Sequence, residues 1–486
     1  MKTKYISIII LLFIISSNIK AQVDNTLYYM TKIPEASLQN PAINSNCKIY
    51  VSGIGIPLAG QILPAMHFNY DNNSFAYRDA IYKGSGNLSD SLVTAFNSIE
   101  DGNNFIEKLH DINYIRTELD INLLSVGYKY KDYYFSVGVR ERIEARATFS
   151  HDLIQLAHEG NGHSFMDNAA NIGGFGATMT HFREYDLGAS KKINKKLTVG
   201  VRAKLLFGKE NFWTKKSDLS WNTDATDYAY TFDADMEFHT SSPIYKINKF
   251  DYDYANDSLM FEDTLYEDIS PKDVVMNGKN FGLGIDLGAI YKFNDKITLY
   301  ASITDLGYIK WKTNTSTFKV NGKFIYDGYD IQPYFTEEDS IITANNEEFA
   351  DSVLQIFMPQ YDNQAYTSHL TPKFFLGGTY NITEKINVGL LARGEVFQNK
   401  LHSSLTISGN TNFKKWFSAS LSYSIMNNSF TNLGLGLMAK AGFAQFYIVT
   451  DNILVIWPQA TRTVNFRMGI NLLFGCKIKE NNSLIE

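Results

Sequence analysis

Three histidines and one glutamate lie close together in the stretch HDLIQLAHEGNGH, residues 151–163. Zinc metalloproteases bind their metal through His-Glu-x-x-His, in which a spacing of four residues puts both histidines on one face of a helix. Here His158 and His163 are five residues apart, about 500° around an α-helix, so their side chains diverge by roughly 140°. The spacing therefore argues against a protease-type zinc site.

Two glycines decide what this stretch is instead. Gly160 and Gly162 interrupt a helix between the histidines, and a glycine is the commonest residue just after a helix end. We predict a short loop helix that ends at Gly160, and we expect neither a metal nor another cofactor. A metal site assembled from His151, His163 and His181 is the minor alternative.

The N-terminus carries an export signal. Lys2 and Lys4 precede a short apolar run, and Ala21 stands at a plausible cleavage site before Gln22. The run is too short to span a membrane as a helix. We predict a signal peptide over residues 1–21 and an exported mature chain.

The composition of the mature chain excludes several classes of protein. No later apolar run reaches about 18 residues, so a helical membrane protein is not expected. The net charge of −6 argues against a nucleic-acid partner. Aromatic residues make up 14% of the chain and charged residues only 20%. An exported chain of this kind leaves the β-barrel membrane class open.

Alternation of apolar and polar residues runs through much of the sequence. In KLTVGVRAKLL the odd positions Leu197, Val199 and Val201 are apolar, whereas Thr198 and Gly200 stand between them. The same period of two recurs in residues 297–304, 416–424 and 464–474. Such a pattern is typical of strands with one apolar and one polar face.

The connections between these strands differ in length at the two ends. Short polar turns are expected near 130–132, 193–195, 293–295, 382–384, 413–415 and 440–442, and long connections at about 210–279 and 312–369. Outer-membrane barrels have short periplasmic turns and long external loops. We therefore predict an all-β, transmembrane, antiparallel barrel of about 14 strands in the bacterial outer membrane. A large soluble β-sandwich or propeller is the alternative.

Smaller features complete the predicted architecture. Residues 48–120 hold three candidate strands and a helix over 88–112, and a second loop helix is expected at 346–358. Trp213, Trp311 and Trp457 are expected near the long-loop side of the membrane, and Trp416 beside a short turn. The acidic loop 213–278 is predicted to be solvated surface; bridging by divalent ions to lipopolysaccharide phosphates is its alternative role.

A longer stretch, HFREYDLGASKKINKKLTVGVRAKLLFGKENF, preceded by EGNG, resembles a family of exported barrels of unknown function. That family is related to the FadL-like fatty-acid channels and to the PorV-type barrels of type IX secretion. Asn40-Pro41-Ala42 and ITDLGYIKW (303–311) fit the same resemblance, which spans nearly the whole chain. It implies a barrel of about 14 strands whose N-terminal segment, residues 22–46, folds inward as a hatch that carries Asn40, Pro41 and Ala42. The barrel itself would then span 47–476, with a periplasmic tail at 477–486.

Charged side chains at inward-facing strand positions are the best candidates for a functional lumen. Charges inside a barrel are tolerated where they meet water or one another. Two interpretations stay open: an ion-pair network that fixes strands and hatch, or a charged lumen that selects a solute. The residues are Arg140, Arg142, Glu144, Arg202, Lys204, Asp286, Arg393, Glu395, Lys440 and Arg467.

The only two cysteines are placed at the two ends of the predicted barrel. Cys47 immediately precedes the first candidate strand and Cys476 closely follows the last. In a closed antiparallel barrel these strands are neighbours, so both thiols lie at the periplasmic rim. A disulfide across the seam is predicted if the stagger of the strands keeps the two Cα atoms within about 7 Å.

Three function classes follow from this architecture. The leading hypothesis is a FadL-like channel for small apolar or amphipathic compounds, by analogy of fold. The second is an accessory or interaction barrel of type IX secretion or of another surface assembly, whose partner surface would be the long loops. An outer-membrane phospholipase is the third and weakest, because no histidine belongs to a recognisable nucleophile motif; we do not expect an enzyme. Outer-membrane lipid and lipopolysaccharide, a hydrophobic small molecule and a secretion-machinery protein are the expected partners.

Overall fold

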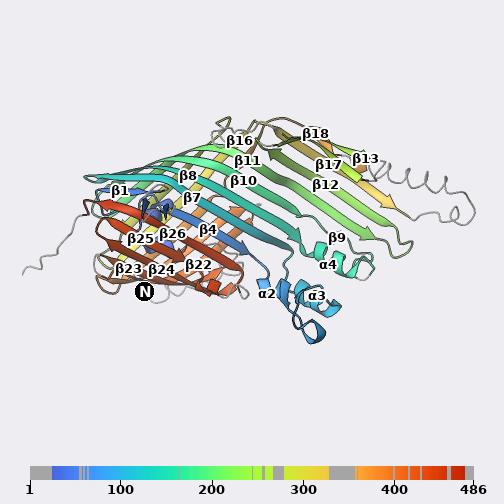
Figure 1. Ribbon diagram of the computed structural model, residues 1–486, viewed down its shortest axis with the longest axis horizontal. Coiled ribbons are helices and arrows are strands. Elements are labelled where there is room, and N and C mark those ends of the chain that lie inside the picture. The colour runs from blue at the N-terminus through green and yellow to red at the C-terminus, as the bar shows by residue number, and fades with distance from the viewer. Residues whose placement is uncertain are drawn as a thin grey trace, which may run out of the picture.

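The chain forms a strand-rich cylinder with a sheet that projects from one end (Figure 1). This computed structural model describes residues 25–476 apart from gaps at 54–56, 59–60, 63–64, 163, 244, 254–257, 266–277, 328–355, 358, 398–399, 414–415, 427–428 and 457–460. The predicted signal peptide, the tail 477–486 and nearly all of the helix expected at 346–358 lie outside the described residues.

Fourteen antiparallel strands close into a barrel, as the alternation predicts. The first strand position is shared by β1 (Ile49–Ser52) and β4 (Ala65–Asn72). The others, in order around the wall, are β7 (Ile112–Tyr130), β8 (Tyr133–Ser150), β10 (Gly176–Lys192), β11 (Leu197–Thr223), β15 (Asn280–Lys292), β16 (Ile297–Trp311), β20 (Lys373–Asn381), β21 (Ile386–Phe397), β22 (Lys400–Thr411), β23 (Phe417–Met426), β24 (Ser429–Ala441), β25 (Ala444–Thr450) and β26 (Thr463–Phe474).

The seam of the barrel lies between its first and last strands. Ile49 of β1 pairs with Phe474 of β26, and Met66 of β4 pairs with Met468. Between β1 and β4 the chain leaves the wall and pairs with itself as the short hairpin β2 (Pro57–Leu58) and β3 (Gln61–Ile62). One strand of the wall is therefore interrupted, and β7 spans the interruption from the other side.

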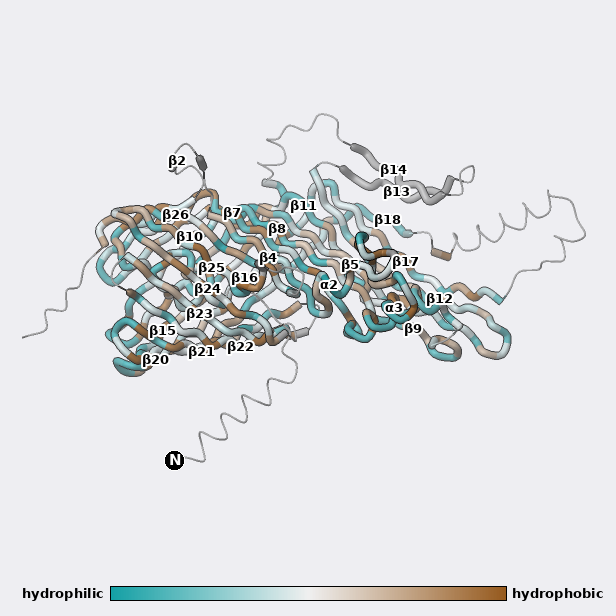
Figure 2. The backbone as a smooth tube through the Cα atoms, turned by 60° about the horizontal axis from the view of Figure 1, so that its bottom comes forward, coloured by the Kyte–Doolittle hydropathy of each residue, from teal (hydrophilic) through white to brown (hydrophobic). Residues whose placement is uncertain are grey.

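The outer surface of the barrel is apolar, because every second residue of its strands points outward. Hydrophobic and hydrophilic residues alternate along the strands in Figure 2. Large exposed apolar side chains recur from strand to strand, among them Val137, Leu187, Val201, Leu287, Leu299, Leu376, Leu390, Ile407, Leu421 and Ile448. A continuous apolar belt of this size is stable only against hydrocarbon or a protein partner.

Asparagine and threonine side chains shape the short turns. Asn194 Oδ1 accepts hydrogen bonds from the backbone N–H groups of Lys196 and Leu197 at 2.8 and 2.9 Å. Asn294 makes the equivalent pair to Lys296 and Ile297, and Thr383 follows the same pattern. Such side chains reproduce a backbone turn, which explains the recurring INKK, FNDK and ITEK sequences at one end of the barrel.

A ring of exposed aromatic side chains, the aromatic girdle, surrounds this short-turn end and consists mainly of tyrosine and phenylalanine. Tyr130, Phe293, Tyr380 and Phe443 are exposed there, together with the predicted Trp416. At the other end Trp311 closes β16 on the long-loop side, as predicted, but it is not exposed like the residues of the girdle; Trp457 lies outside the described residues. The indole of Trp311 is enclosed by the wall and the long connections. Its ring is fully buried against Phe182, Leu206 and Ile309, and its indole N–H donates to Ser368 Oγ at 2.8 Å.

The long connections extend the sheet of the wall beyond the barrel and add a few short helices. The upper half of β11 continues past the wall and pairs with β12, which pairs with β17 (Figure 1). The elements at this end are β12 (Tyr230–Ser241), β17 (Thr315–Tyr326), β18 (Gln360–Asp362), β19 (Tyr366–His369), β9 (Ala170–Asn171), β13 (Tyr245–Asp253), β14 (Ser258–Leu265), β5 (Ile81–Lys83), β6 (Leu92–Thr94), α2 (Tyr77–Ala80), α3 (Ile99–Ile106), α4 (His151–Glu159), η4 (Gly86–Leu88) and η5 (Ile453–Ile456).

Two predictions for this region need correction. The helix expected over 88–112 is limited to α3, because residues 92–94 pair with β5, a contact that periodicity cannot show. One of the three candidate strands expected within residues 48–120, SFAYRD (74–79), instead forms the start of α2 and the residues that precede it. No helix among the described residues is long and apolar enough to cross a bilayer.

The N-terminal segment lies inside the barrel. It forms η2 (Thr26–Tyr29) and η3 (Pro34–Leu38), and nearly all of its residues are buried. Leu27, Met30 and Ile33 pack against Met438, Tyr447 and Val449 of the wall. We call residues 25–46 the hatch, the name that the family resemblance supplies.

Candidate functional site

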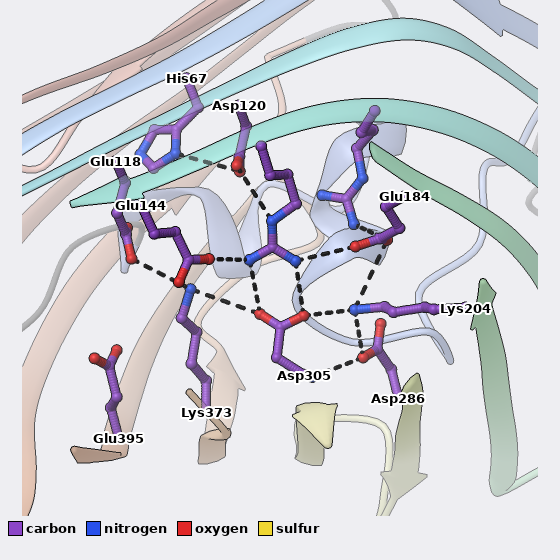
Figure 3. A network of polar contacts seen from close by, with 12 residues as sticks. His67, Glu118, Asp120, Glu144, Glu184, Lys204, Asp286, Asp305, Lys373 and Glu395 are labelled. Carbon is purple, nitrogen blue, oxygen red and sulfur yellow. Dashed lines mark hydrogen bonds and ion pairs between the residues drawn. The ribbon is translucent and has the colours of Figure 1, made fainter. Parts of the chain in front are cut away.

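A layer of charged side chains crosses the lumen above the hatch (Figure 3). On β7 and β8 the register places like charges directly opposite each other: Arg116 faces Arg146, and Glu118 faces Glu144. We call these two pairs the arginine tier and the glutamate tier. Like charges opposite each other on neighbouring strands are destabilising, so each tier needs a counter-charge from elsewhere.

Part of this counter-charge lies on the same side of the barrel, where Asp71 of β4 is 2.8 Å from Arg116 and Arg142 of β8 is 2.7 Å from Glu144. The rest comes from the opposite wall. Glu395 of β21 accepts hydrogen bonds from Arg116 Nη1 at 3.0 Å and from Arg146 Nη2 at 3.1 Å. Lys373 of β20 places Nζ 3.6 Å from Glu118 Oε1. The two tiers therefore join β7 and β8 to β20 and β21 across the lumen.

A second group of ion pairs lies next to the tiers. Lys204 Nζ is 2.7 Å from Asp286 and 2.6 Å from Asp305. Arg142 contacts Asp305 at 2.9 Å and Glu184 at 3.0 Å, and Arg140 also pairs with Glu184. Burial of charge is costly unless each charge is paired, and here each buried charge has an opposite neighbour.

The structure brings together most of the inward residues that the sequence indicates. Glu144 lies at the upper edge of the layer, and Lys440 lies apart at the short-turn rim, where its Nζ is 2.9 Å from Cys476 Sγ. The remaining predicted residues are buried and belong to the layer: Arg140, Arg142, Arg202, Lys204, Asp286, Arg393, Glu395 and Arg467.

Several residues of the layer escaped the sequence reasoning. Three of them stand at alternate positions of the segment NYIRTELD, so their period of two was visible in the sequence. Asp305 was harder to find, because its backbone takes a left-handed φ of 61°, which interrupts the alternation. The missed residues are Arg116, Glu118, Asp120, Arg146, Glu184, Asp305 and Lys373.

One charged cluster points outward instead. Glu141 faces away from the lumen and pairs with His181 and Arg183, each at 2.7 Å, and with Lys209. Outward charges are tolerated near the edge of a membrane and costly at its centre. His181 is therefore occupied in this cluster and does not approach His151.

The histidine-rich stretch 151–163 contains a loop helix. α4 ends at Gly160, with a φ of 75°, as predicted. His158 Nε2 lies 3.2 Å from the carbonyl oxygen of Ile99 and thus joins α4 to α3; His163 lies outside the described residues. Within the part of the chain that the structure describes, no group of three or more His, Cys, Asp or Glu side chains is placed to hold a metal ion.

The hatch is bound to the wall by polar contacts along its length. Thr26 N donates to Asp451 at 2.7 Å, and Thr26 Oγ1 lies 2.7 Å from Ser422 Oγ. Glu35 accepts hydrogen bonds from Ser52 at 2.9 Å and Asn471 at 2.8 Å. Burial raises the pKa of Glu35, although these two hydrogen bonds favour its charged form.

Asn40, Pro41 and Ala42 occupy a gap that glycines leave in the wall. A Cβ atom at Gly200 would lie 2.2 Å from the carbonyl oxygen of Pro41, and one at Gly288 would lie 2.2 Å from Asn40 Oδ1. Only glycine permits this close approach. Asn40 Oδ1 accepts from Ala42 N at 3.0 Å, and its Nδ2 donates to Tyr28 OH at 3.1 Å.

Two cavities of very different size lie above the hatch. The larger, which we call the vestibule, has a volume of about 450 Å³ and is lined by both tiers and by residues near the long-loop ends of the strands, including Trp213, Leu370 and Phe397. The smaller, of about 40 Å³, lies within the charged layer against Leu38 and Gln39 of the hatch. It has room for only one or two water molecules.

A disulfide joins the hatch to the end of the barrel. In the structure Cys47 is bonded to Cys476 across 429 residues of sequence, and both pack against Tyr50, Tyr134 and Leu473. The bond lies where Cys47, which precedes β1 by two residues, meets Cys476, which follows the end of β26 by two residues. The base of the hatch is thereby fixed to the rim.

The chain is similar over most of its length to solved barrels. The toluene transporter TbuX of Ralstonia pickettii shares 8% identity, with a TM-score of 0.37 over 91% of this chain and 94% of that one. A FadL homologue of Pseudomonas aeruginosa shares 10% identity, with a TM-score of 0.39 over 95% and 100%. The toluene transporter TodX of P. putida shares 9%, with a TM-score of 0.35 over 90% and 92%.

A comparison with curated proteins gives no match. A family model does match, and it covers residues 41–451, from the hatch motif to the residue after β25. The chain therefore belongs to this family, described as a family of unknown function (DUF5723).

Proposed function

We propose that the protein is an outer-membrane channel for small apolar or amphipathic compounds, gated by its hatch. The observation that carries the proposal is the contrast between the two cavities. A solute enters the vestibule of about 450 Å³, but the space of about 40 Å³ beneath it admits no solute until the hatch moves. The predicted signal peptide and the apolar belt support location in the outer membrane.

The contacts of the hatch favour a swinging movement. Its first residues are held by hydrogen bonds to Asp451 and Ser422, which are non-covalent, whereas its base is held by the covalent Cys47–Cys476 bond. A hatch that releases its first contacts pivots about Cys47 and stays attached to the rim. The lumen then opens on the short-turn side.

Uptake measured with a lockable hatch tests this proposal. The double variant Thr26→Cys, Ser422→Cys replaces two oxygens that lie 2.7 Å apart, so oxidation joins hatch to wall. We expect the oxidised variant to take up labelled apolar and amphipathic compounds no faster than cells without the gene. The matched controls are the two single variants under the same oxidant, which should keep wild-type uptake. Equal uptake by the locked and single variants would reject hatch gating, and equal uptake with and without the gene would reject the channel.

A second candidate function rests on the projecting sheet. β11, β12 and β17 form a hydrogen-bonded sheet that continues beyond the wall. Passage of a solute through the lumen does not require such a sheet. This surface favours an accessory barrel of type IX secretion or of another surface assembly. Purification from gently solubilised membranes separates the two functions: a stoichiometric large partner supports the accessory barrel, and an isolated monomer supports the channel.

A further inference from the structure

The floor of the vestibule holds buried guanidinium nitrogens that no described residue satisfies. Arg116 and Arg146 both line the cavity, and their side chains are only 3% and 8% exposed. Each gives one nitrogen to Glu395, but Arg116 Nη2 and Arg146 Nη1 have almost no accessible surface and no hydrogen-bond partner among the described residues. Buried donors of this kind are costly, so the arginine tier favours an additional acceptor.

The guanidinium of Arg146 is also fixed in orientation. Its central carbon lies 3.4 Å from the ring centre of Phe397 and 5.3 Å from that of Tyr114. Stacking between two aromatic rings holds the guanidinium plane. An oxyanion of a ligand therefore meets donors that are already positioned, which is typical of a built binding site.

The next tier offers the opposite charge to the same cavity. Glu118 and Glu144 line the vestibule beside the arginines. Both ion pairs of Glu118 are 3.6 Å long, beyond hydrogen-bond distance. Glu144 is bonded to Arg142 through Oε1, and its side chain is 21% exposed. The glutamate tier thus retains acceptor capacity for a cationic donor.

We infer that the vestibule binds a zwitterion of the amino-acid or short-peptide type. Its carboxylate meets Arg116 and Arg146, its ammonium meets Glu118 and Glu144, and its apolar side chains pack against Trp213 and Phe397. A simple anion would match only the arginine tier, and a simple cation would match only the glutamate tier, whereas a zwitterion matches both. The inference rests on the proposed function, for which it names the class of solute.

A matched series of three ligands tests the inference on the unmodified protein. The dipeptide Phe-Leu carries both charges, N-acetyl-Phe-Leu lacks the ammonium, and Phe-Leu amide lacks the carboxylate. Isothermal titration calorimetry with the full chain in detergent should show that Phe-Leu binds at least about tenfold more tightly than either relative. If N-acetyl-Phe-Leu bound as tightly as Phe-Leu, the site would be an anion site and the inference would be wrong. If Phe-Leu amide bound as tightly as Phe-Leu, the site would be a cation site, which also contradicts the inference. No binding of Phe-Leu would overturn the inference outright.

Two substitutions should divide the affinity between the tiers. Arg146→Gln is expected to weaken Phe-Leu and N-acetyl-Phe-Leu by about tenfold and to leave the amide unchanged. Glu144→Gln is expected to weaken Phe-Leu and the amide and to leave the acetylated peptide unchanged. Asp79→Asn, which alters an ion pair outside the cavity, is the control. If both variants weaken all three peptides equally, the tiers act on structure and not on charge recognition, and the inference is wrong.

Binding and transport are measured separately, so their failures are distinguishable. Calorimetric binding of Phe-Leu without any gene-dependent uptake would leave the zwitterion site in place and reject the channel. Gene-dependent uptake of apolar compounds without binding of Phe-Leu would keep the channel and reject the zwitterion site.

Discussion

At the scale of single residues, the lumen shows how like charges are made tolerable inside a barrel. Arg116 and Arg146 face each other and share Glu395, which is fully buried. This carboxylate does more than offset two charges. Among the ion pairs of the described residues, it alone joins β21 to the arginine tier. Its removal should therefore expose both the electrostatic and the architectural role of the tier.

Substitution of this carboxylate tests the point directly. We expect Glu395→Gln to lower the free energy of unfolding by about 3 kcal/mol, because it removes the counter-charge of buried Arg146 and leaves Arg116 with Asp71 as its hydrogen-bonded partner. The measurement is urea unfolding of the barrel in detergent or lipid. Asp79→Asn breaks a partly exposed ion pair with Lys108 and should cost less than about 1 kcal/mol; equal losses in the two variants would contradict this account.

The charge on Glu35 of the hatch should make docking of the hatch depend on pH. Burial raises its pKa, so the docked hatch binds a proton more tightly than an undocked hatch does. Docking is then strongest below the ordinary carboxyl pKa and weakens as pH rises through the raised value. After correction for the intrinsic base-catalysed rate, the hydrogen-exchange protection factors of residues 26–43 should fall as pH rises in the wild type and stay constant in Glu35→Gln. The same fall in both proteins would assign it to other groups.

At the scale of elements, the hatch and the wall are fitted to each other through missing side chains. Gly200 and Gly288 leave the space that Pro41 and Asn40 occupy. The inward position of these glycines follows from the period of two in β11 and β15, but their purpose does not, because a sequence pattern cannot show what approaches a strand from inside.

A side chain in this space should displace the hatch. Gly200→Val is expected to loosen residues 25–46, since its Cβ would overlap backbone atoms of Pro41. Single-channel conductance in a planar bilayer should rise. The matched control is Gly409→Ala on β22, where a Cβ atom meets no neighbour within 4 Å. An unchanged conductance in Gly200→Val would mean that the hatch does not limit passage.

The sequence predicted the repeating parts of the molecule well and the exceptional parts poorly. Alternation in segments such as 197–205 predicts the strands and their two faces, because a barrel repeats one local rule. Trp311 lies at the predicted end of its strand, but its burial was not predictable, since it depends on β19 and β20, which are about 60 residues further along the chain. The arginine and glutamate tiers depend on the register between strands, and part of their counter-charge lies across the lumen. Neither relation is local in sequence.

At the scale of the whole molecule, the apolar belt and the projecting sheet define two different surroundings. Leu287 of β15 lies on the belt, whereas Ile325 of β17 lies on the projecting sheet, and both are well exposed. The same substitution at these two positions should therefore affect membrane insertion to different extents.

An arginine at each position measures this difference. Leu287→Arg should lower the stability of the inserted barrel by about 2–4 kcal/mol, because it places a charge on the lipid face. Ile325→Arg should have little effect. Folding of each variant into lipid vesicles over a series of urea concentrations gives the two free energies of folding. Equal tolerance at the two positions, or recovery of the processed chain as a soluble monomer without detergent, would reject the membrane barrel.

The seam bond acts on the whole cylinder. Ser substitution at Cys47 or at Cys476 should lower stability by about 2–4 kcal/mol, and by the same amount in either variant, because both remove one cross-link. Mass spectrometry under non-reducing conditions should recover the two cysteine peptides as one linked species. Two free thiols in protein from the cell envelope would show that the seam is not cross-linked.

On the export route that the signal peptide predicts, the two sulfur atoms of this bond reach the oxidising compartment at very different times, since 429 residues separate them. During export the first thiol waits without its own partner until the last strand arrives. A truncated polypeptide that lacks β26 and Cys476 keeps the Cys47 thiol without its partner, and it leaves unpaired the strand edges of β1, β4 and β25 that β26 would cover. The oxidation state of one atom thus reports whether synthesis was completed, and an envelope reductase or protease that recognises thiols could separate unfinished copies from finished ones.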